Sequence, residues 1–150
     1  MPRLVAAVAA ASVAAAVALG MTHVLTQHQL DAARADNAAV ARIATAPDAR
    51  VETTRTSVGG TVTVVFSAGQ RAAVIATAGM ASLPAAETYQ LWVISPAGAR
   101  SAGLLSRAGQ AGSVLASWVR PGDRIGITVE PSGGTSSPTT TPVVAVPVPA

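Results

Sequence analysis

A chain of 150 residues that is 50% hydrophobic supports one compact domain with a short accessory segment. Its formal net charge is only +3 and its arginines are scattered along the chain, which argues against a nucleic-acid-binding surface. The absence of cysteine excludes a disulfide framework, thiol catalysis and thiolate metal sites.

The first predicted element is an apolar segment from Leu4 to Leu25, which contains no charged side chain. As a helix it is long enough to cross a hydrocarbon core of about 30 Å, although its many alanines make the driving force for insertion weak. A cleaved signal peptide fits almost as well, with Arg3 as its basic region and residues 16–18 as its cleavage site. We therefore predict a transmembrane anchor or a signal peptide at 1–25, with the remainder of the chain facing outward.

Residues 26–46 have apolar side chains at near-helical spacing, with charged side chains between them. This pattern predicts a juxtamembrane helical stalk that continues the membrane helix. The stalk is expected to end at Ala46, because the residue before Pro47 is pushed out of the α region. A solvated linker of the same composition is the alternative.

Residues 47–150 consist of short β-rich runs separated by Gly, Pro and Ser, which is typical of an all-β domain. The pattern predicts an immunoglobulin-like or Greek-key β-sandwich. About eight strands are expected, at 50–56, 61–67, 72–78, 88–94, 101–105, 113–118, 124–130 and 143–148.

Three of these runs allow more specific predictions. The strand at 124–130 alternates branched aliphatic residues with polar or small ones, so one of its faces is expected to be exposed. The strand at 88–94 has large apolar groups on both faces, as a central strand does. Prolines 147 and 149 place the last strand at a sheet edge, after a Pro-, Thr-, Ser- and Gly-rich connection over 131–142.

Candidate chemical sites are few. His23 and His28 do not share one helical face and have no carboxylate at zincin spacing, so neither a metal site nor a cofactor is predicted. No Gly-x-Ser-x-Gly motif is present for a nucleophilic serine. Asp123 and the two Gly-Gly pairs are explained by turns. Trp92 and Trp118 are candidates for a ligand platform, but we predict that both are packing anchors.

Several segments resemble, in the same order, the C-terminal domain of the anti-sigma-K factor family (RskA-like): Thr88–Val93, Ser101–Leu105, Thr128–Gly134 and Ser137–Val144. The shorter stretches Ala46–Val51 and Val64–Ser67 are similar to the early part of that domain. The residues that carry the resemblance, taken as structural, are Tyr89, Gln90, Leu91, Trp92, Gly103, Glu130, Pro131, Gly133, Gly134, Pro138, Thr139 and Pro142.

The resemblance implies an actinobacterial single-pass protein of the cell membrane with an extracytoplasmic C-terminal domain. That domain would control cleavage of the anchor by extracytoplasmic and intramembrane proteases, which frees an extracytoplasmic-function sigma factor and so regulates transcription. The implied partners are the lipid bilayer, the proteases and the sigma factor, and no cofactor or nucleic acid is implied.

One feature departs from the family pattern. Family members place a helical anti-sigma domain before the membrane helix, whereas only Met1, Pro2 and Arg3 precede it here. A start assigned too far downstream, a separate sigma-binding polypeptide, or reuse of the outer domain alone would each explain this.

Three function classes follow from the sequence. A regulatory membrane-anchored domain is the leading prediction. A secreted or cell-surface binding module without sigma-factor control is the alternative, and an extracytoplasmic enzyme comes last because the carboxylates are few and dispersed.

Overall fold

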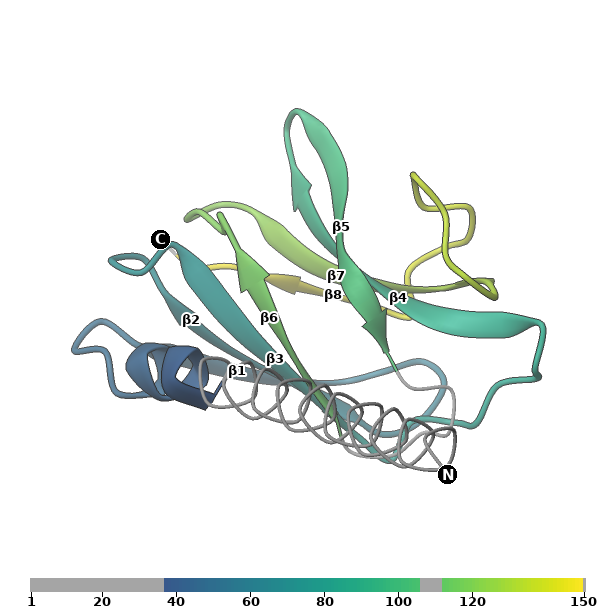
Figure 1. Cartoon of the computed structure of the whole chain (residues 1–150), viewed down its shortest axis with the longest axis horizontal. Coiled ribbons are helices and arrows are strands. Elements are labelled where there is room, and N and C mark those ends of the chain that lie inside the picture. The colour runs from purple at the N-terminus through teal and green to yellow at the C-terminus, as the bar shows by residue number, and fades with distance from the viewer. Residues whose placement is uncertain (1–36, 106–111, 150) are drawn as a thin grey trace, which may run out of the picture. The chain divides into compact units, whose positions relative to one another are not determined.

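The computed structural model describes residues 37–105 and 112–149, which are mostly β (Figure 1). One short helix covers residues 37–44. The strands are β1 (Arg50–Arg55), β2 (Thr61–Ser67), β3 (Ala72–Ala78), β4 (Glu87–Ser95), β5 (Gly98–Leu105), β6 (Gly112–Ser117), β7 (Arg124–Pro131) and β8 (Val144–Pro147). These eight strands coincide with the predicted ones to within a few residues, so the all-β prediction is confirmed.

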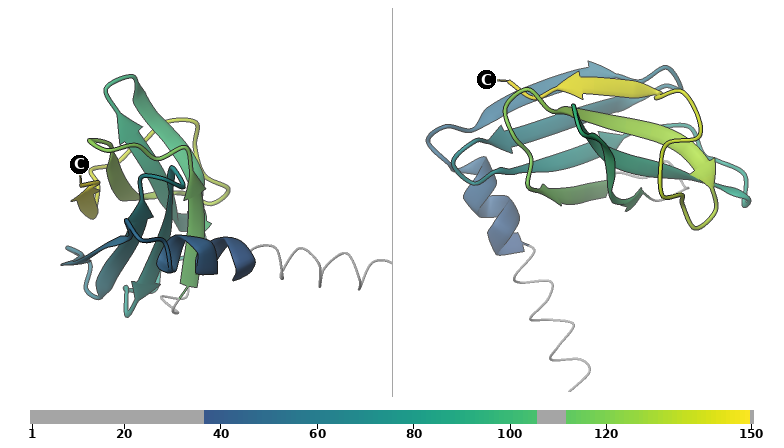
Figure 2. Two further views of the ribbon diagram at one scale, coloured as in Figure 1. Left: turned by 90° about the vertical axis from the view of Figure 1, so that its left-hand side faces the viewer. Right: turned by 90° about the horizontal axis from the view of Figure 1, so that it is seen from above.

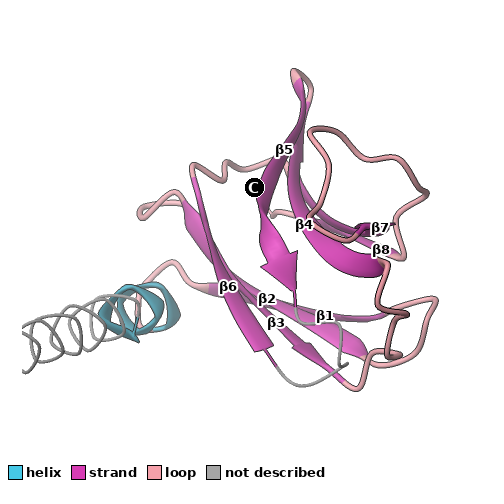
Figure 3. Cartoon of the chain, turned by 45° about the vertical axis from the view of Figure 1, so that its right-hand side comes forward, coloured by secondary structure: helices cyan, strands magenta, loops and turns pink. Residues whose placement is uncertain are grey.

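The strands form two antiparallel sheets of four strands each, coloured magenta in Figure 3. Their orders are β1-β2-β3-β6 and β5-β4-β7-β8. β4 pairs with β7 three strands further along the chain, as in a Greek key. In the first sheet β3 likewise skips two strands to pair with β6. The two antiparallel four-stranded sheets confirm the coarse prediction, and the more specific immunoglobulin-like topology stays a prediction.

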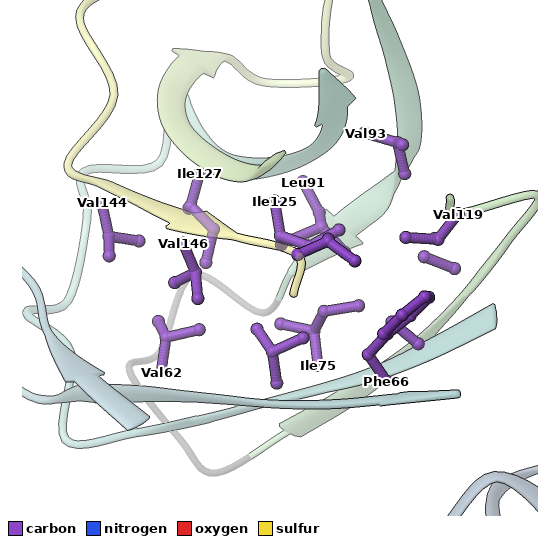
Figure 4. Packing of buried hydrophobic residues seen from close by; sticks show 14 of the residues in the cluster. Val62, Phe66, Ile75, Leu91, Val93, Val119, Ile125, Ile127, Val144 and Val146 are labelled. Atoms are coloured by element: carbon purple, nitrogen blue, oxygen red, sulfur yellow. The ribbon is translucent and has the colours of Figure 1, made fainter. Parts of the chain in front are cut away.

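The main core lies between the facing sides of the two sheets. Figure 4 shows Val62, Phe66 and Ile75 of the first sheet opposite Ile125 and other residues of the second. The four named side chains are each at most 2% exposed. The core consists largely of Val, Ile and Leu, as the composition predicted. Since each fully buried aliphatic side chain contributes about 1.5–3 kcal/mol, this cluster is the main source of stability.

β4 lies inside its sheet, as its two apolar faces predicted, and β8 lies at the edge, as its prolines predicted. Tyr89 and Leu91 point into the core, whereas Trp92 is buried without joining that cluster. The register between β4 and β5 shifts at Leu91/Trp92, where Leu91 pairs with Gly103. Gly103 has a φ of 137°, which suits the irregular backbone of such a β-bulge.

The prediction that strand 124–130 has an exposed face is wrong. Ile125 and Ile127 enter the core as expected, but Thr128 and Glu130 on the other face are 0% and 1% exposed. Alternation correctly assigned the residues to the two faces of β7. It could not show that the second face is also covered.

The helix over residues 37–44 ends one turn before Pro47, close to the predicted end. Thr45 closes it, since both its backbone N–H and its hydroxyl donate to the carbonyl of Ala41. Ile43 is 3% exposed and packs with Ala72 and Val74 of β3, on the side of the first sheet away from the main core. The end of the predicted stalk is therefore a helix packed against the β domain, and the linker alternative is wrong for these residues. The two views of Figure 2 show this helix beside the strands.

The predicted anchor or signal peptide at 1–25 and the first part of the predicted stalk lie outside the described residues. Within 37–105 and 112–149, no helix has both the length and the apolar character needed to span a membrane.

Candidate functional site

A buried carboxylate organises the connection between β7 and β8. Glu130 lies near the end of β7, and the chain that follows folds back over it. The Glu130 Oε1 atom accepts from the backbone N–H of Thr139 at 2.9 Å, and Oε2 accepts from the Thr135 hydroxyl at 3.1 Å. The Thr139 hydroxyl also donates to Oε2. One side chain thus fixes two points of a loop that has no strand or helix of its own.

Gln90 of β4 holds the same loop from a second strand. Its Oε1 accepts from the backbone N–H of Thr135 at 2.8 Å, and its Nε2 donates to the carbonyl of Thr135 at 2.9 Å. The Nε2 group also donates to the Ser101 hydroxyl of β5 at 2.9 Å. Gly134 allows this approach, because a Cβ added there would lie 2.9 Å from the Gln90 oxygen and its φ is 79°.

Trp92 extends the network across the sheet. Its indole Nε1–H donates to the Thr128 hydroxyl oxygen at 2.8 Å, and Thr128 in turn hydrogen bonds to the Glu130 carboxylate. Desolvation by itself raises the pKa of the Glu130 carboxyl. The hydrogen bonds from Thr128, Thr139 and Thr135 outweigh desolvation and lower this pKa to about 2. The carboxylate is therefore ionised at neutral pH and suited to hold the loop, not to exchange protons.

Five of the residues that carry the family resemblance meet in this network: Gln90, Trp92, Glu130, Gly134 and Thr139. The others take separate structural positions. Tyr89 and Leu91 lie in the core, Gly103 lies at the bulge, and the remaining members lie on or beside the loop, namely Pro131, Gly133, Pro138 and Pro142. In the described part of the chain, each buried side-chain nitrogen or oxygen has a hydrogen-bond partner.

A second cluster fixes the junction between the helix and β1. The Asp48 carboxylate accepts from the Ser67 hydroxyl at 2.8 Å and from the backbone N–H of Gly69 at 2.7 Å. The Ser67 oxygen in turn accepts from the N–H of Gln70 at 3.1 Å. The Gly69 N–H and then the Ser67 hydroxyl lower the pKa of Asp48, against an opposing effect of burial. Asp48 and Ile43 thus hold both sides of residues 44–47 against the β domain.

The packing prediction is confirmed for Trp92 and wrong for Trp118, which is 67% exposed. Trp118 follows the end of β6 with a φ of 61°, and its neighbour Val119 enters the core in its place. The indole ring instead lies beside the guanidinium of Arg71, with 5.1 Å between the guanidinium carbon and the ring centroid.

The turn predictions are confirmed. The Asp123 carboxylate accepts from the backbone N–H of Arg120 at 2.9 Å, and both Gly-Gly pairs have positive φ values in turns between strands. In the described ranges, no three side chains among His, Cys, Asp and Glu are grouped to hold a metal ion. The two histidines lie outside those ranges.

Sequence reasoning did not single out Thr128, Thr135 or Arg71. A weak signal for the two threonines was present in the sequence. Hydroxyl residues cluster around Glu130, which the alternation of its strand places on the face opposite the core. Arg71 carried none, because its contact with Trp118 joins two positions far apart in the sequence.

The fold and its network define a two-sheet β domain whose C-terminal loop is fixed by a buried carboxylate. Comparison with known proteins gives the family. Residues 5–143 match the model described as anti-sigma-K factor RskA, C-terminal. The chain belongs to this family, which is associated with regulation of sigma factors.

Three relatives illustrate the similarity. A Streptomyces griseus protein described as uncharacterized, in the phr 5' region, is 37% identical over 145 residues, which are 93% of this chain and 60% of that protein. The anti-sigma-K factor RskA of Mycolicibacterium vanbaalenii is 36% identical over 102 residues, or 67% and 42% of the two chains. RskA of Mycobacterium ulcerans is 31% identical over 151 residues, or 98% and 62%. The chain thus spans about half the length of these relatives, and no solved structure matches it.

Proposed function

We propose that this chain is the extracytoplasmic, membrane-anchored part of an anti-sigma regulator, and that its β domain controls proteolysis of the segment that joins it to the anchor. The family match over residues 5–143 is the observation that supports this most strongly. The apolar segment 1–25 would be the anchor in a single-pass arrangement. A sigma factor would be bound through an anti-sigma domain beyond the region described here or on a separate polypeptide.

Contacts at the junction between the helix and the β domain supply a mechanism for the proposed control of proteolysis. A protease must bind its substrate in an extended conformation, so it needs residues 44–47 released from their neighbours. Ile43, which is 3% exposed, and the hydrogen bonds of Asp48 oppose that release. Proteolysis of locally opened segments follows the population of the open form, so loosening either contact speeds cleavage.

The test is a pulse-chase measurement of the tagged full-length chain in a bacterial host. Deleting residues 47–150 should shorten the lifetime of the anchor most. Asp48→Asn should shorten it less, because the amide cannot accept both hydrogen bonds with its two side-chain polar atoms. Glu52→Gln is the matched control, since Glu52 is an exposed carboxylate on β1.

Hydrogen exchange of the amides at 43–49 establishes whether the Asp48 variant has opened the junction. Faster exchange with an unchanged anchor lifetime would refute the proposed gating. If exchange stays slow in Asp48→Asn, the junction has not opened and the variant Ile43→Asp is measured instead. Faster exchange with an unchanged anchor lifetime in that variant would likewise refute the gating.

A secreted or cell-surface binding module is the second candidate, and the exposed Trp118 favours it because a large exposed aromatic side chain is common at binding surfaces. N-terminal sequencing of the exported protein distinguishes the two candidates. A new terminus after residue 18 supports the secreted module, and retention of residues 1–25 supports the membrane-anchored regulator.

A further inference from the structure

Two strained residues touch each other at one end of the β domain. In the described part of the chain, Arg71 and Trp118 are the non-glycine residues with positive φ, at 50° and 61°. Bulky side chains rarely adopt this conformation, and such backbone strain clusters at ligand-binding positions. The two side chains form a cation–π pair with a separation of 5.1 Å. The strain is therefore concentrated on one exposed aromatic residue and its cationic neighbour.

The backbone around Trp118 is fixed on both sides. The N–H of Val119 donates to the carbonyl of Arg71 at 2.9 Å, and Val119 itself is 0% exposed. On the other side, the Arg100 guanidinium of β5 donates to the carbonyl of Ser117 at 2.6 Å. The indole is thus presented by a backbone that cannot easily relax, although its ring is largely in solvent. A rigid, exposed aromatic side chain loses little conformational entropy when it binds a ligand.

Trp118 also forms a wall of two hollows. One, of about 270 Å³, contains Arg71. The other, of about 350 Å³, lies between the β4–β5 turn and the β6–β7 connection and is lined by Arg100, Arg120, Ser95 and Asp123 among others. The larger volume is at the low end of the range for small-ligand sites, about 300–1,000 Å³. It suits a compact ligand bound at the surface.

The chemistry of the larger hollow narrows the ligand class. Its two arginines and one aspartate sum to a formal charge of 2 − 1 = +1, and Asp123 already accepts the backbone N–H of Arg120. Guanidinium groups bind carboxylates through paired hydrogen bonds. The indole face suits the C–H groups of a sugar ring, while Ser95 and Asp123 suit hydroxyl groups. The Ser95 hydroxyl already donates to the Gly98 carbonyl and accepts from the Ala97 N–H, and Asp123 Oδ2 accepts from the Arg120 N–H. Both side chains have acceptor capacity left for a hydroxyl donor, and a purely aromatic acid does not supply one.

We propose that this hollow binds a sugar that carries a carboxylate, with its ring packed on Trp118 and its carboxylate on Arg100 and Arg120. The binding site stands on the geometry alone. Only the origin of the ligand, a glycan of the cell envelope, rests on the proposed extracytoplasmic location. Failure of the binding test therefore leaves the proteolysis proposal standing, and the reverse also holds.

The test is a titration of the isotope-labelled full-length chain in a mild detergent with sodium glucuronate, glucose and sodium benzoate. The chain has two tryptophans. The indole N–H signal of Trp118 reports on the proposed site, and that of buried Trp92 serves as an internal reference. Glucuronate should shift the Trp118 signal and leave that of Trp92 in place. Glucose should bind at least roughly tenfold more weakly, because it lacks the charge that the arginines recognise.

Variants assign the contacts. Trp118→Ala should abolish saturable binding, measured by calorimetry, while Arg120→Gln should weaken glucuronate roughly tenfold without changing glucose. Arg100→Gln should weaken glucuronate at least as much and should also weaken glucose, because Arg100 holds the Ser117 carbonyl beside Trp118. Arg55→Gln on β1 is the matched control and should bind as the unaltered chain does. Circular dichroism identifies any variant that fails to fold, in which case Trp118→Phe, expected to retain weakened binding, replaces Trp118→Ala.

Three results of the binding measurements would overturn the proposal, and so would one result of the titration followed by the indole signals. These are binding that survives in Trp118→Ala, equal affinity for glucose and glucuronate, or tighter binding of benzoate than of glucuronate. Absence of a Trp118 shift at saturating glucuronate concentrations counts equally against it.

Discussion

The segments at the two ends of β7 treat a difficult side chain in opposite ways. At one end Glu130 is a charge with 1% exposure, and threonine donors surround it. At the other end Trp118 is a large aromatic side chain with 67% exposure and a strained backbone. Glu130 is a buried charge whose hydrogen bonds are satisfied. Trp118 departs from two general tendencies, because a large aromatic side chain is exposed and its backbone has a positive φ. Residues that break local rules without a structural gain are where function is expected, so the comparison separates a stabilising network from a candidate binding site.

The largest expected effect comes from breaking the stabilising end. Glu130→Gln keeps the size of the side chain but replaces one acceptor oxygen with an N–H group that faces the hydroxyl and amide donors of Thr135 and Thr139. Because hydrogen bonds to a buried charge contribute about 1.5–3 kcal/mol, we expect the free energy of unfolding to fall by about 2–3 kcal/mol. Urea denaturation of the full-length chain measures this. A loss no greater than that of the exposed control Glu52→Gln would show that the network contributes little.

Acid should act on the same end. The pKa of Glu130 is about 2 in the folded protein, below the ordinary value of 4.5 that applies after unfolding. Its contribution to stability is therefore complete above pH 4.5 and declines as the pH falls from there toward 2. Thermal unfolding followed between pH 7 and pH 3 should show this decline, and Glu130→Gln should flatten it. Asp48, whose pKa is also lowered, should leave a residual slope of the same sign. A curve of unchanged steepness in Glu130→Gln would assign the acid sensitivity to other groups.

The strands could be predicted because their signals are local. The turns Val58–Gly60 and Ser95–Gly98, together with the alternation in 124–130, fix where strands begin and which way side chains point. The polar network could not be predicted in the same way. Gln90 and Thr135 meet only after the loop folds back across the sheet. A sequence pattern assigns residues to faces but does not show what covers a face.

Trp118 was mispredicted for a different physical reason. The expectation that a rare, large aromatic side chain packs inside is sound on average and holds for Trp92, which is 0% exposed. The positive φ at Trp118 reverses it, and nothing in the identity of a tryptophan signals that conformation. The packing of Ile43 also depends on tertiary structure that no local pattern shows. Helical periodicity predicted the helix but not that its last turn packs against β3.

The smallest expected effect is a gain in stability at the strained end. Asparagine tolerates positive φ better than tryptophan, so Trp118→Asn should relieve about 1 kcal/mol of strain and lose about 0.5 kcal/mol from the contact with Arg71. We expect a net increase of about 0.5 kcal/mol in the free energy of unfolding. Val51→Asn is the matched control, because Val51 is 62% exposed without a positive φ and should lose up to about 1 kcal/mol. If Trp118→Asn lost stability as the control does, the indole would be a structural residue and the contrast between the two ends would disappear. A gain would show that Trp118 lowers the stability of the fold, as is expected of a side chain that serves binding.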